Sequence, residues 1–454
     1  MALIIYSFLL RVFSPFVWAW MGWRARRAGG TWQIFGAERF GSYAQPWDGA
    51  APVWVHAVSL GETRAAQSLI LGLVSGGDRV LLTHTTPTGR AEGARLFGAE
   101  IAAGQVRQQW LPYDFPGATQ RFMAHYRPRL GLLIEREVWP NLIDQANRAQ
   151  VPMLLVSARF SETAKKHVNQ IDRLFRTLMR DAYAKLDLVL AQTADDASRL
   201  FDVGVGNVRV TGNLKFDLPL PIVAVESGRA WRARLNRPMI AIASTREGED
   251  AMFTQALAHL PAQPTSGQQA VSPLFLLIPR HPQRFDEAAS LLDLAGLRSV
   301  RWSLIRHDAQ ADHFLDGVQV VLGDTLGEMP FFYAASDVAI VAGSFAPLGG
   351  QNLIEACAVG TPVIVGPHAR NFADAVEGAV TAGAALQIDL VQGTDLAERA
   401  LATAQLWLHD PETLRVRACA AREWVAQHTG ATQRILSEIS DFEAARATRV
   451  RPPD

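Results

Sequence analysis

Residues 337–367 read DVAIVAGSFAPLGGQNLIEACAVGTPVIVGP and hold an apolar run, a glycine-rich turn, a helical stretch and a second apolar run. The runs at 337–343 and 361–367 are short and rich in Val and Ile, which is typical of strands buried on both faces of a sheet. Two strands joined through a helix can pair in parallel. This stretch therefore predicts one βαβ unit of a parallel sheet.

Similar runs alternate with helical stretches on the amino-terminal side of this unit. In the same half of the chain they are PMIAIAS (238–244), LFLLIPR (274–280) and VQVVLGD (318–324). Another six lie further upstream: VWVHAV (53–58), VLLTHT (80–85), LGLLIE (130–135), PMLLVS (152–157), LDLVLAQ (186–192) and VRVTG (208–212). The alternation predicts two mostly parallel sheets covered by helices. Between the two series, LPLPIVAVESGRA (218–230) contains prolines and shows no clear period, which indicates a linker.

Two Rossmann-like halves joined by a linker describe the GT-B architecture, an α/β fold in which two domains face each other across a cleft. The 454 residues suit two or three domains at ~100–200 residues each. The expected segments are an apolar helix at 1–23, a first domain at 24–217, a linker at 218–237, a second domain at 238–410 and carboxyl-terminal helices at 411–454.

Composition and missing motifs exclude several classes of protein. Lys and Arg together number 44, as do Asp and Glu, so no global field attracts nucleic acid. Cys357 and Cys419 form no metal-ligand spacing. The first strand is followed by Ser-Leu-Gly-Glu (59–62) rather than G-x-G-x-x-G, and no P-loop is present. Neither NAD chemistry nor ATP hydrolysis is expected, and no carboxylate pair at a strand end suggests a metal.

The first 23 residues carry one charge, Arg11, and are followed by Arg24, Arg26 and Arg27. The run is long enough to cross a bilayer at ~20 residues, although Arg11 near its middle would be costly there. The alternatives are a strained signal anchor, an interfacial helix and a buried core helix. Basic residues after the apolar run predict that the rest of the chain is cytoplasmic.

Polar side chains follow the strands of the first half, where ligands of open α/β folds bind. Glu62 ends HAVSLGE (56–62) and is either a general base or a carboxylate that caps a helix. The Thr-rich turn 83–89 suits an anion, a sugar or capping. Glu135 and Glu137 flank an arginine after a buried strand, so one of them is expected to be an ion-pair lock. Lys215 lies in TGNLKFD (211–217) at the mouth of the expected cleft.

The second half offers guanidinium groups and a glycine-rich turn. Arg280 and Arg284 are candidate clamps for a phosphate or carboxylate. Glycines at 343–350 would let the backbone approach a phosphate at the start of a helix, where Glu355 could accept hydrogen bonds from ribose hydroxyls. Gly-rich packing with a capping acid is the structural alternative.

Nine strings, in this order, resemble the family of Kdo (3-deoxy-D-manno-oct-2-ulosonic acid) transferases. They are HAVSLGE, TTPTG, LPYDFPGA, EREVWPNLI, TGNLKFD, ASTREGE, PRHPQRF, LGDTLGEM and GGQNLIE. The matching part runs from about His56 to His368, and the amino-terminal apolar helix with AERFGSY also resembles that family.

The resemblance implies an inverting glycosyltransferase of lipopolysaccharide assembly on the cytoplasmic face of the bacterial inner membrane. Its first half would bind the lipid A precursor (lipid IVA), and its second half would bind CMP-Kdo. Residues 1–23 would contact membrane lipid. Glu62 is the implied general base and Glu135 a second essential acid. The implied substrate-binding residues are Lys215, Arg280, His281, Gly327, Glu328, Ser344, Gly350, Asn352 and Glu355. No cofactor, metal or nucleic acid is implied.

The chain departs from the family pattern at two places. Gln351 stands where the family commonly has His, and 355–360 read EACAVG rather than EPAALG. Because Gln cannot become cationic near pH 7, an acid role for that His does not transfer. The rival hypotheses are a UDP-sugar transferase or epimerase with the same fold, and a tethered binding protein with a degenerate site.

Overall fold

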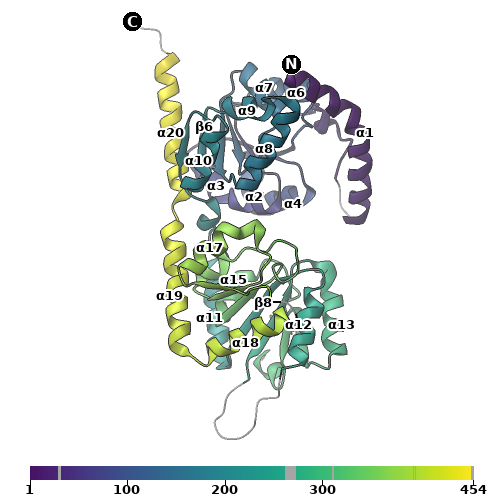
Figure 1. Ribbon diagram of the computed structural model, residues 1–454, viewed down its shortest axis with the longest axis vertical. Helices are drawn as coiled ribbons and strands as arrows, with labels where there is room; N and C mark the ends of the chain where they lie inside the picture. The colour runs from purple at the N-terminus through teal and green to yellow at the C-terminus, as the bar shows by residue number, and fades with distance from the viewer. Residues whose placement is uncertain (29–31, 261–271, 309–310, 392, 394, 451–454) are drawn as a thin grey trace. The chain divides into compact units, whose positions relative to one another are not determined.

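The protein folds into two compact units, which are described separately. The computed structural model describes residues 1–28, 32–260, 272–308, 311–391, 393 and 395–450. Unit 1 comprises Met1–Leu218 with His428–Asp454, and unit 2 comprises Pro219–Gln427 (Figure 1). Each unit is built around a seven-stranded sheet in which every pairing is parallel. The predicted α/β fold with two Rossmann-like sheets is confirmed.

The sheet of unit 1 has the order β3-β2-β1-β4-β5-β6-β7. Its strands are β1 (Val53–His56), β2 (Val80–His84), β3 (Val106–Trp110), β4 (Leu130–Ile134), β5 (Met153–Ala158), β6 (Leu188–Ala191) and β7 (Val208–Val210). The chain order reverses between β1 and β4. Such a switch point is where open α/β sheets bind their ligands, beyond the carboxyl ends of the strands.

Helices cover both faces of this sheet, which explains why its central strands are mainly apolar. They are α1 (Ala2–Ala28), α2 (Leu60–Ala65), α3 (Gln67–Ser75), α4 (Pro87–Leu96), α5 (Gly98–Ala102), α6 (Pro116–Tyr126), α7 (Pro140–Arg148), α8 (Glu162–Phe175), α9 (Leu178–Ala184), α10 (Ala194–Asp202) and α20 (Ala431–Val450). In β1, Val53 and Val55 join the core under α3 and α20, whereas Trp54 between them packs with Phe122 of α6 on the other face.

The sheet of unit 2 has the order β10-β11-β9-β8-β12-β13-β14. Its strands are β8 (Met239–Thr245), β9 (Leu274–Pro279), β10 (Ser299–Arg301), β11 (Val320–Leu322), β12 (Val338–Val341), β13 (Val363–Val365) and β14 (Ala385–Gln387). Its helices are α11 (Ile222–Leu235), α12 (Glu249–Ala258), α13 (Phe285–Leu294), α14 (Trp302–Ile305), α15 (Met329–Ala335), α16 (Ile354–Val359), α17 (Ala373–Thr381), α18 (Leu396–Leu408) and α19 (Pro411–His428). The switch point of this sheet lies between β8 and β12.

Most of the segment expected to be a linker, 218–237, is helix α11 of unit 2. Val225, Gly228 and Trp231 are its buried residues, and α11 packs on α15. A Cβ atom at Gly228 would lie 2.3 Å from the carbonyl oxygen of Phe331, so only glycine allows this close approach. The helix was not predicted because its sequence shows no clear apolar stripe: its closest contact with α15 is made at a glycine.

The amino-terminal apolar helix is confirmed as α1, which runs along one side of unit 1 (Figure 1). Residues Ala2–Trp23 have a mean hydropathy of 1.7, and only 11% of the most apolar window is buried. The alternative of a buried core helix is therefore wrong. The side chains of Arg24 and Arg27 are not among those that the structure describes.

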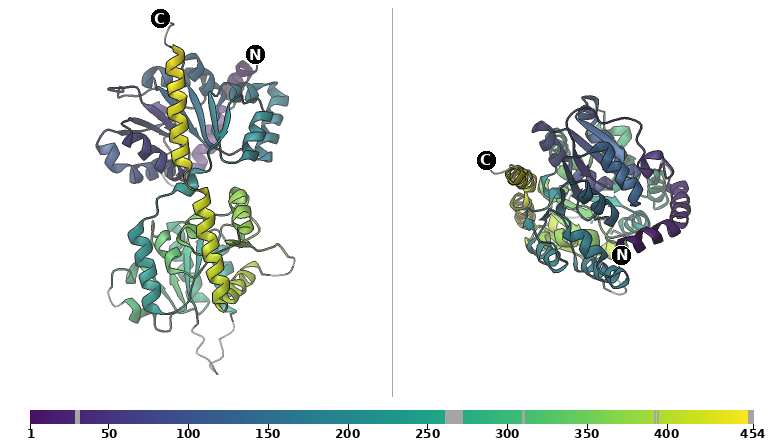
Figure 2. Two further views of the ribbon diagram at one scale, coloured as in Figure 1. Left: turned by 90° about the vertical axis from the view of Figure 1, so that its left-hand side faces the viewer. Right: turned by 90° about the horizontal axis from the view of Figure 1, so that it is seen from above.

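The carboxyl-terminal helices divide between the two units. Figure 2 shows α19 along unit 2 and α20 along unit 1. Ile435 and Ile439 of α20 are buried in the core that contains Val53 and Val55. Unit 1 is therefore discontinuous in sequence.

Candidate active site

Glu62 lies at the carboxyl edge of the sheet in unit 1, in the first turn of α2. Its Oε2 atom accepts hydrogen bonds from the backbone N–H groups of Val58 (2.5 Å) and Ser59 (3.2 Å), and Ser59 Oγ accepts one from the N–H of Glu62. This is a complete capping box. The capping role foreseen for Glu62 is therefore present, and it fixes the carboxyl group at the tip of β1.

The pKa of Glu62 is raised to about 8. Burial is the main cause, followed by the negative charges of Glu137 and Glu135, while the two backbone hydrogen bonds oppose the shift. A carboxyl group that ionises near neutral pH suits proton transfer. Like-charge neighbours and burial together are typical of functional sites.

Glu135 follows β4 directly and is buried, with a positive φ of 62°. Its Oε1 atom lies 2.5 Å from Nζ of Lys215, whose side chain is only 17% exposed. The ion-pair lock foreseen for this segment is formed by Glu135 and Lys215, and the adjacent Arg136 is exposed. Read in isolation, Lys215 looks like a solvated residue; in the fold it neutralises a buried carboxylate.

Strained backbone gathers around this ion pair. Ser157, at the end of β5, also has a positive φ, of 52°, and its Oγ accepts a hydrogen bond from the N–H of Leu214, beside Lys215. A positive φ in a non-glycine residue is uncommon and is found preferentially at functional sites. The strain supports a functional interpretation of the edge that carries Glu135.

Glu137 is a third acid of this edge, noted in the sequence beside Glu135 but not among the expected site residues. Its Oε2 accepts a hydrogen bond from the Trp139 indole N–H at 2.9 Å. Burial raises the pKa of Glu137 despite this bond and the charge of Arg136. Its importance lies in its effect on Glu62, which depends on the fold rather than on local sequence.

The neighbouring polar side chains of unit 1 have structural partners. Thr86 caps α4 by accepting from the N–H of Gly89 and donates to the Val58 carbonyl at 2.7 Å, so the capping alternative holds for this Thr. His56 and His84 are buried, and burial lowers their pKa values to about 3 and about 4. Both imidazoles are therefore neutral at physiological pH.

In unit 2, the buried carboxylate of Glu249 ties the ends of β8 and β12 together. It accepts from the backbone N–H groups of Gly343 (2.6 Å), Phe345 (2.9 Å), Ala346 (3.1 Å) and Arg246 (3.0 Å). Glu249 was not among the expected site residues, although it lies in the quoted ASTREGE string. A carboxylate with four N–H donors holds the glycine-rich turn in one conformation.

Arg284 is not an available clamp, contrary to the sequence-based interpretation. Its Nε and Nη2 atoms donate to Oδ2 of the buried Asp250 at 2.7 and 2.5 Å. Thr245 also donates to Asp250. Because Asp250 neutralises its charge at close range, Arg284 stabilises the local structure at the end of β8.

Arg246 and Arg280 carry positive charge at the ends of β8 and β9, and His281 follows Arg280 in the chain. The Arg280 N–H donates to the Thr245 carbonyl at 2.9 Å, which joins the two strand ends. Burial and then the positive charges of Arg280 and Arg246 lower the pKa of His281, and Arg246 also forms an ion pair with Glu247 at 3.1 Å. An anionic ligand would reduce the repulsion between the positive charges.

The glycine-rich turn is shaped by three left-handed glycines, with φ values of 72° at Gly343, 99° at Gly349 and 84° at Gly350. The buried Ser344 hydroxyl donates to the Val341 carbonyl and accepts from the N–H of Gly366. The Ser344 side chain therefore holds the turn. Gly350 lies close to Ala369, whose Cα atom would be 3.2 Å from an added Cβ.

Glu355 and Asn352 lie together where this turn enters α16. Nδ2 of Asn352 is 3.3 Å from Oε1 of Glu355, and Oδ1 of Asn352 accepts from the N–H of Ile354 at 3.0 Å. Glu355 and Arg280 both influence the pKa of the buried Tyr333, in opposite directions and after the larger effect of burial.

Glu328 and Gly327 lie in the turn between β11 and α15. Oε2 of Glu328 accepts from Thr325 and from the Trp302 indole N–H (3.1 Å), and Arg306 lies 3.4 Å away. Gly327 is exposed, with a φ of 84° and open space around its Cα. Glu328 therefore shapes the turn that presents Gly327.

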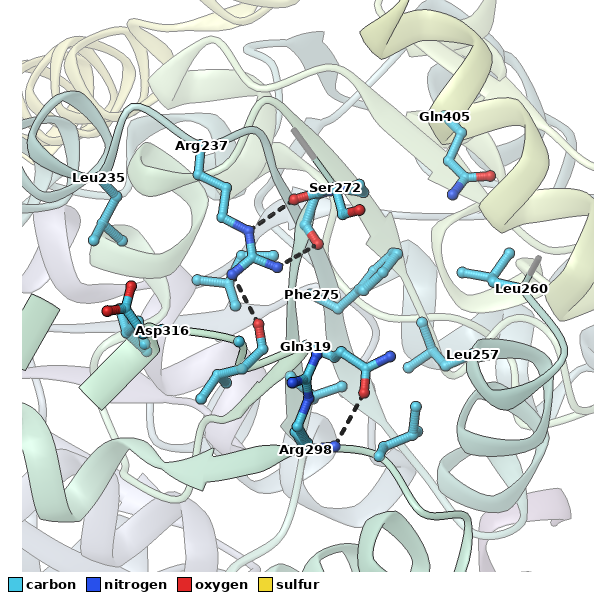
Figure 3. Close-up of a pocket in the computed structure, with 17 residues that line it drawn as sticks. Leu235, Arg237, Leu257, Leu260, Ser272, Phe275, Arg298, Asp316, Gln319 and Gln405 are labelled. Carbon is cyan, nitrogen blue, oxygen red and sulfur yellow. Dashed lines mark hydrogen bonds between the residues drawn. The ribbon is translucent and has the colours of Figure 1, made fainter. Parts of the chain in front are cut away.

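A cavity of about 590 Å³ lies at the opposite edge of the same sheet. Figure 3 shows Arg237 in this cavity donating to the carbonyl groups of Ser272, Pro273 and Val318. These residues border the amino ends of the strands, away from the expected site residues of unit 2, which follow the carboxyl ends. Because carbonyl groups occupy the Arg237 guanidinium, this group is not available to an anion.

Comparison with known proteins points to one family. A family model described as "3-Deoxy-D-manno-octulosonic-acid transferase (kdotransferase)" matches residues 36–218. A 3-deoxy-D-manno-octulosonic acid transferase of Bordetella pertussis is 54% identical over 96% of this chain and 99% of its own length. A transferase of the same name from Haemophilus influenzae is 29% identical over 96% and 98% of the two chains.

Solved structures with a similar fold are more distant in sequence. A putative UDP-N-acetylglucosamine 2-epimerase of Listeria monocytogenes has a TM-score of 0.56 at 14% identity, covering 87% of this chain and 98% of its own. A glycosyltransferase of Rickettsia africae has a TM-score of 0.53 at 14% identity, covering 87% and 99%. These likenesses concern the fold alone.

Proposed function

The chain belongs to the family of Kdo transferases, and we propose that it moves Kdo from CMP-Kdo onto the lipid A precursor lipid IVA, with inversion at the anomeric carbon. The family makes the chain a glycosyltransferase. The observation that carries the proposed chemistry is the carboxyl group of Glu62, held at a strand tip among two other acids with a pKa of about 8.

In the proposed reaction, unit 1 takes the acceptor and Glu62 is the general base. A hydroxyl oxygen of the acceptor forms the new bond to the anomeric carbon of Kdo, and its proton passes to Glu62. The bond between that carbon and the CMP phosphate oxygen breaks, and its electron pair stays on the phosphate. Attack from the face opposite the leaving group inverts the anomeric centre. Glu135, paired with Lys215, is proposed to maintain the electrostatics and geometry of this edge.

Unit 2 is proposed to hold the donor. Arg246, Arg280 and His281 would contact the phosphate, where negative charge develops as the bond to Kdo breaks. Glu355, with Asn352 beside it at 3.3 Å, would accept hydrogen bonds from the ribose hydroxyls. Because Ser344 and Glu328 are already engaged in the turns they shape, their part in substrate binding is proposed to be indirect.

Membrane association through α1 at the cytoplasmic face of the inner membrane belongs to the same proposal. It is supported by the apolar, exposed run Ala2–Trp23 and by the lipid nature of the proposed acceptor. A tether keeps the enzyme at the surface where its acceptor lies and so raises the effective concentration of that acceptor.

The test is an assay of the full chain with CMP-Kdo and lipid IVA, read by mass spectrometry and by NMR of the new linkage. We expect lipid IVA carrying Kdo in the configuration opposite to that of the donor. A product that retains the configuration would overturn the mechanism but not the substrates. Turnover of UDP-N-acetylglucosamine with no turnover of CMP-Kdo would instead favour the rival epimerase function.

A further inference from the structure

We infer that α1 lies in the plane of the membrane surface, attached along one side to unit 1 and presenting its other side to anionic lipid, rather than crossing the bilayer. The inference rests on the proposed membrane association and selects one of the two membrane arrangements, a spanning anchor and an interfacial helix, that the sequence left open. It is carried by the contacts of α1 and by the distribution of exposed side chains around it.

One side of α1 is docked on unit 1 by polar contacts near its start. The Tyr6 hydroxyl donates to Oδ2 of Asp114 at 3.0 Å, and the Ser7 hydroxyl lies 2.9 Å from Oδ1 of Asn141. Asp114 is buried and also accepts from the N–H groups of Asn141 and Leu142 at the start of α7. The docking of α1 is thus part of a buried hydrogen-bond network.

The docking continues further along the same helix. Ser14 is buried, and the Trp18 ring packs against Phe40 and Phe115 with centroid distances of 5.7 and 6.1 Å. Positions 7, 14 and 18 recur at intervals of seven and four, so they lie on one side of an α-helix. From Tyr6 to Trp18 the contact extends for about 18 Å at 1.5 Å per residue.

A helix docked over this length cannot also cross a bilayer. Asp114 and Asn141 belong to the folded α/β unit, and they would have to follow α1 into the hydrocarbon if the docked part of α1 spanned it. Buried polar groups and the irregular backbone around them are not tolerated in contact with lipid. The docked part of α1 must therefore run tangentially to unit 1 and along the membrane surface.

The opposite side of α1 is apolar and exposed. Ile4 is 74% exposed, Phe8 62% and Phe16 72%, and with the exposed Val12 they recur at intervals of four. Further exposed apolar residues of the helix are Ile5, Phe13, Val17, Trp20 and Trp23. An apolar surface of this extent is unusual on a soluble protein and is typical of a membrane contact.

The position of Arg11 agrees with the in-plane arrangement. Arg11 is exposed and lies four residues after Ser7 and seven after Ile4, so it is at the boundary between the docked side and the apolar side. In a spanning helix it would lie near mid-bilayer; in the plane it reaches the headgroups. Exposed Arg26 on α1, and exposed Lys166 and Arg173 on the contacting helix α8, add positive charge suited to anionic lipid.

The attachment also has a consequence for the acceptor. Tyr113, Asp114 and Asn141 follow β3 and β4, so the contacts of α1 are at the same carboxyl edge as Glu62 and Glu135. A lipid surface along α1 would place the sugar head of an embedded acceptor beside this edge.

The topology test uses the full chain with Cys357→Ala and Cys419→Ser and a short polar extension ahead of Met1 that carries one cysteine. A reference form carries Ser227→Cys on exposed α11 instead. In spheroplasts, a membrane-impermeant maleimide should label both forms only after permeabilisation, because both cysteines lie on the cytoplasmic side. Labelling of the extension in intact spheroplasts would show a spanning helix and overturn the inference while leaving membrane association standing. A protein found wholly in the soluble fraction would overturn both.

A matched pair of substitutions tests the docking. Ser7→Leu places a large side chain into the buried contact with Asn141, whereas Ala19→Leu adds the same apolar group at an exposed position of α1. On vesicles of phosphatidylethanolamine and phosphatidylglycerol, Ser7→Leu should lower the thermal midpoint of unit 1 by several degrees, and Ala19→Leu should leave it unchanged. Equal midpoints for both variants would mean that α1 leaves unit 1 on the membrane and would overturn the inference.

Discussion

A carboxylate that caps its own helix acts as a base most efficiently when its pKa lies near the working pH, and Glu62 meets that condition. Its capping bonds favour the ionised form, whereas burial and the charges of Glu137 and Glu135 favour the protonated form and prevail. Because the pKa of Glu62 is about 8 in the folded protein, a minority of molecules carry the ionised base at pH 7.

The rate should therefore rise with pH. We expect kcat/KM to increase about tenfold per pH unit below pH 8 and to level off above it, since only ionised Glu62 accepts the proton. Glu62→Gln keeps an acceptor for the capping bonds and should cost ~10²–10⁴-fold, and the residual rate should lose this pH dependence. Glu137→Gln removes a negative charge that raises the pKa of Glu62. The rise of kcat/KM with pH should therefore occur at lower pH in this variant.

Glu100→Gln on α5 is the matched control, because within the described residues no hydrogen bond or ion pair joins its side chain to this edge. It should leave the pH profile unchanged. A Glu62→Gln variant with wild-type turnover and the same rise would place the base elsewhere.

Glu355 permits a second prediction at this scale. Glu355→Ala removes the proposed partner of the ribose hydroxyls, and each lost charge-assisted hydrogen bond is worth about 1.5–3 kcal/mol. Affinity for CMP should fall by one to two orders of magnitude in titration calorimetry, while acceptor binding stays the same. Glu226→Ala, exposed on α11 of the same unit, is the control; equal CMP affinity for both variants would rule out the ribose role.

Local motifs in the sequence point to single residues but do not show the partners that the fold gives them. Glu62, Glu135 and Lys215 were predicted as site residues from their motifs, and their roles stay predictions; the structure adds that Glu135 pairs with Lys215 and that the charge of Glu135 contributes to the raised pKa of Glu62. Arg284 was misjudged because its partner, Asp250, lies on another element. Glu249 was overlooked because its four N–H partners come from two strand ends far apart in sequence.

At the scale of elements, prediction succeeded for the central strands and for the edge strand β7, and it failed at the other three sheet edges. β3, β10 and β14 were not predicted, and each is the last strand at one end of its sheet. In β3, only Val106 and Trp110 are buried, with three polar residues between them. An edge strand lacks the continuous apolar run that a strand covered on both faces requires.

Helix α11 gives a prediction for this scale. A Cβ atom at Gly228 would meet the Phe331 carbonyl oxygen at 2.3 Å, so Gly228→Ala must push α11 away from α15. Overpacking of this kind typically costs ~1–3 kcal/mol, which should appear as a lower denaturant midpoint for unit 2. Ser227→Ala, exposed one position earlier, should leave the midpoint unchanged. An unchanged Gly228→Ala protein would mean that the two helices do not depend on this contact.

At the scale of the whole molecule, the pattern of apolar runs predicted two sheets but not which unit owns the last helix. α20 follows unit 2 in sequence yet completes the core of unit 1. Asp217, at the end of the first part of unit 1, accepts hydrogen bonds from the N–H groups of Gly430 (2.7 Å) and Thr432 (2.5 Å). A carboxylate at a helix start is favourable, so Asp217 fixes the start of α20 more than 200 residues later in the chain.

A substitution near the carboxyl terminus should therefore destabilise strands near the amino terminus. Ile435 of α20 is fully buried against the face of the sheet that includes Val53 and Leu82. Ile435→Ala removes buried methyl groups and leaves a cavity. Such a change typically lowers the free energy of unfolding by roughly 2–5 kcal/mol. Hydrogen exchange should accelerate in β1 and β2, while β8 and β12 of unit 2 keep their protection, because the lost contacts belong to unit 1 alone.

Ser437→Ala, exposed on the same helix, is the control and should accelerate exchange in neither pair of strands. Faster exchange in β8 and β12 but not in β1 and β2 would contradict the assignment of α20 to unit 1, and equal acceleration in all four strands would mean that the two units unfold as one.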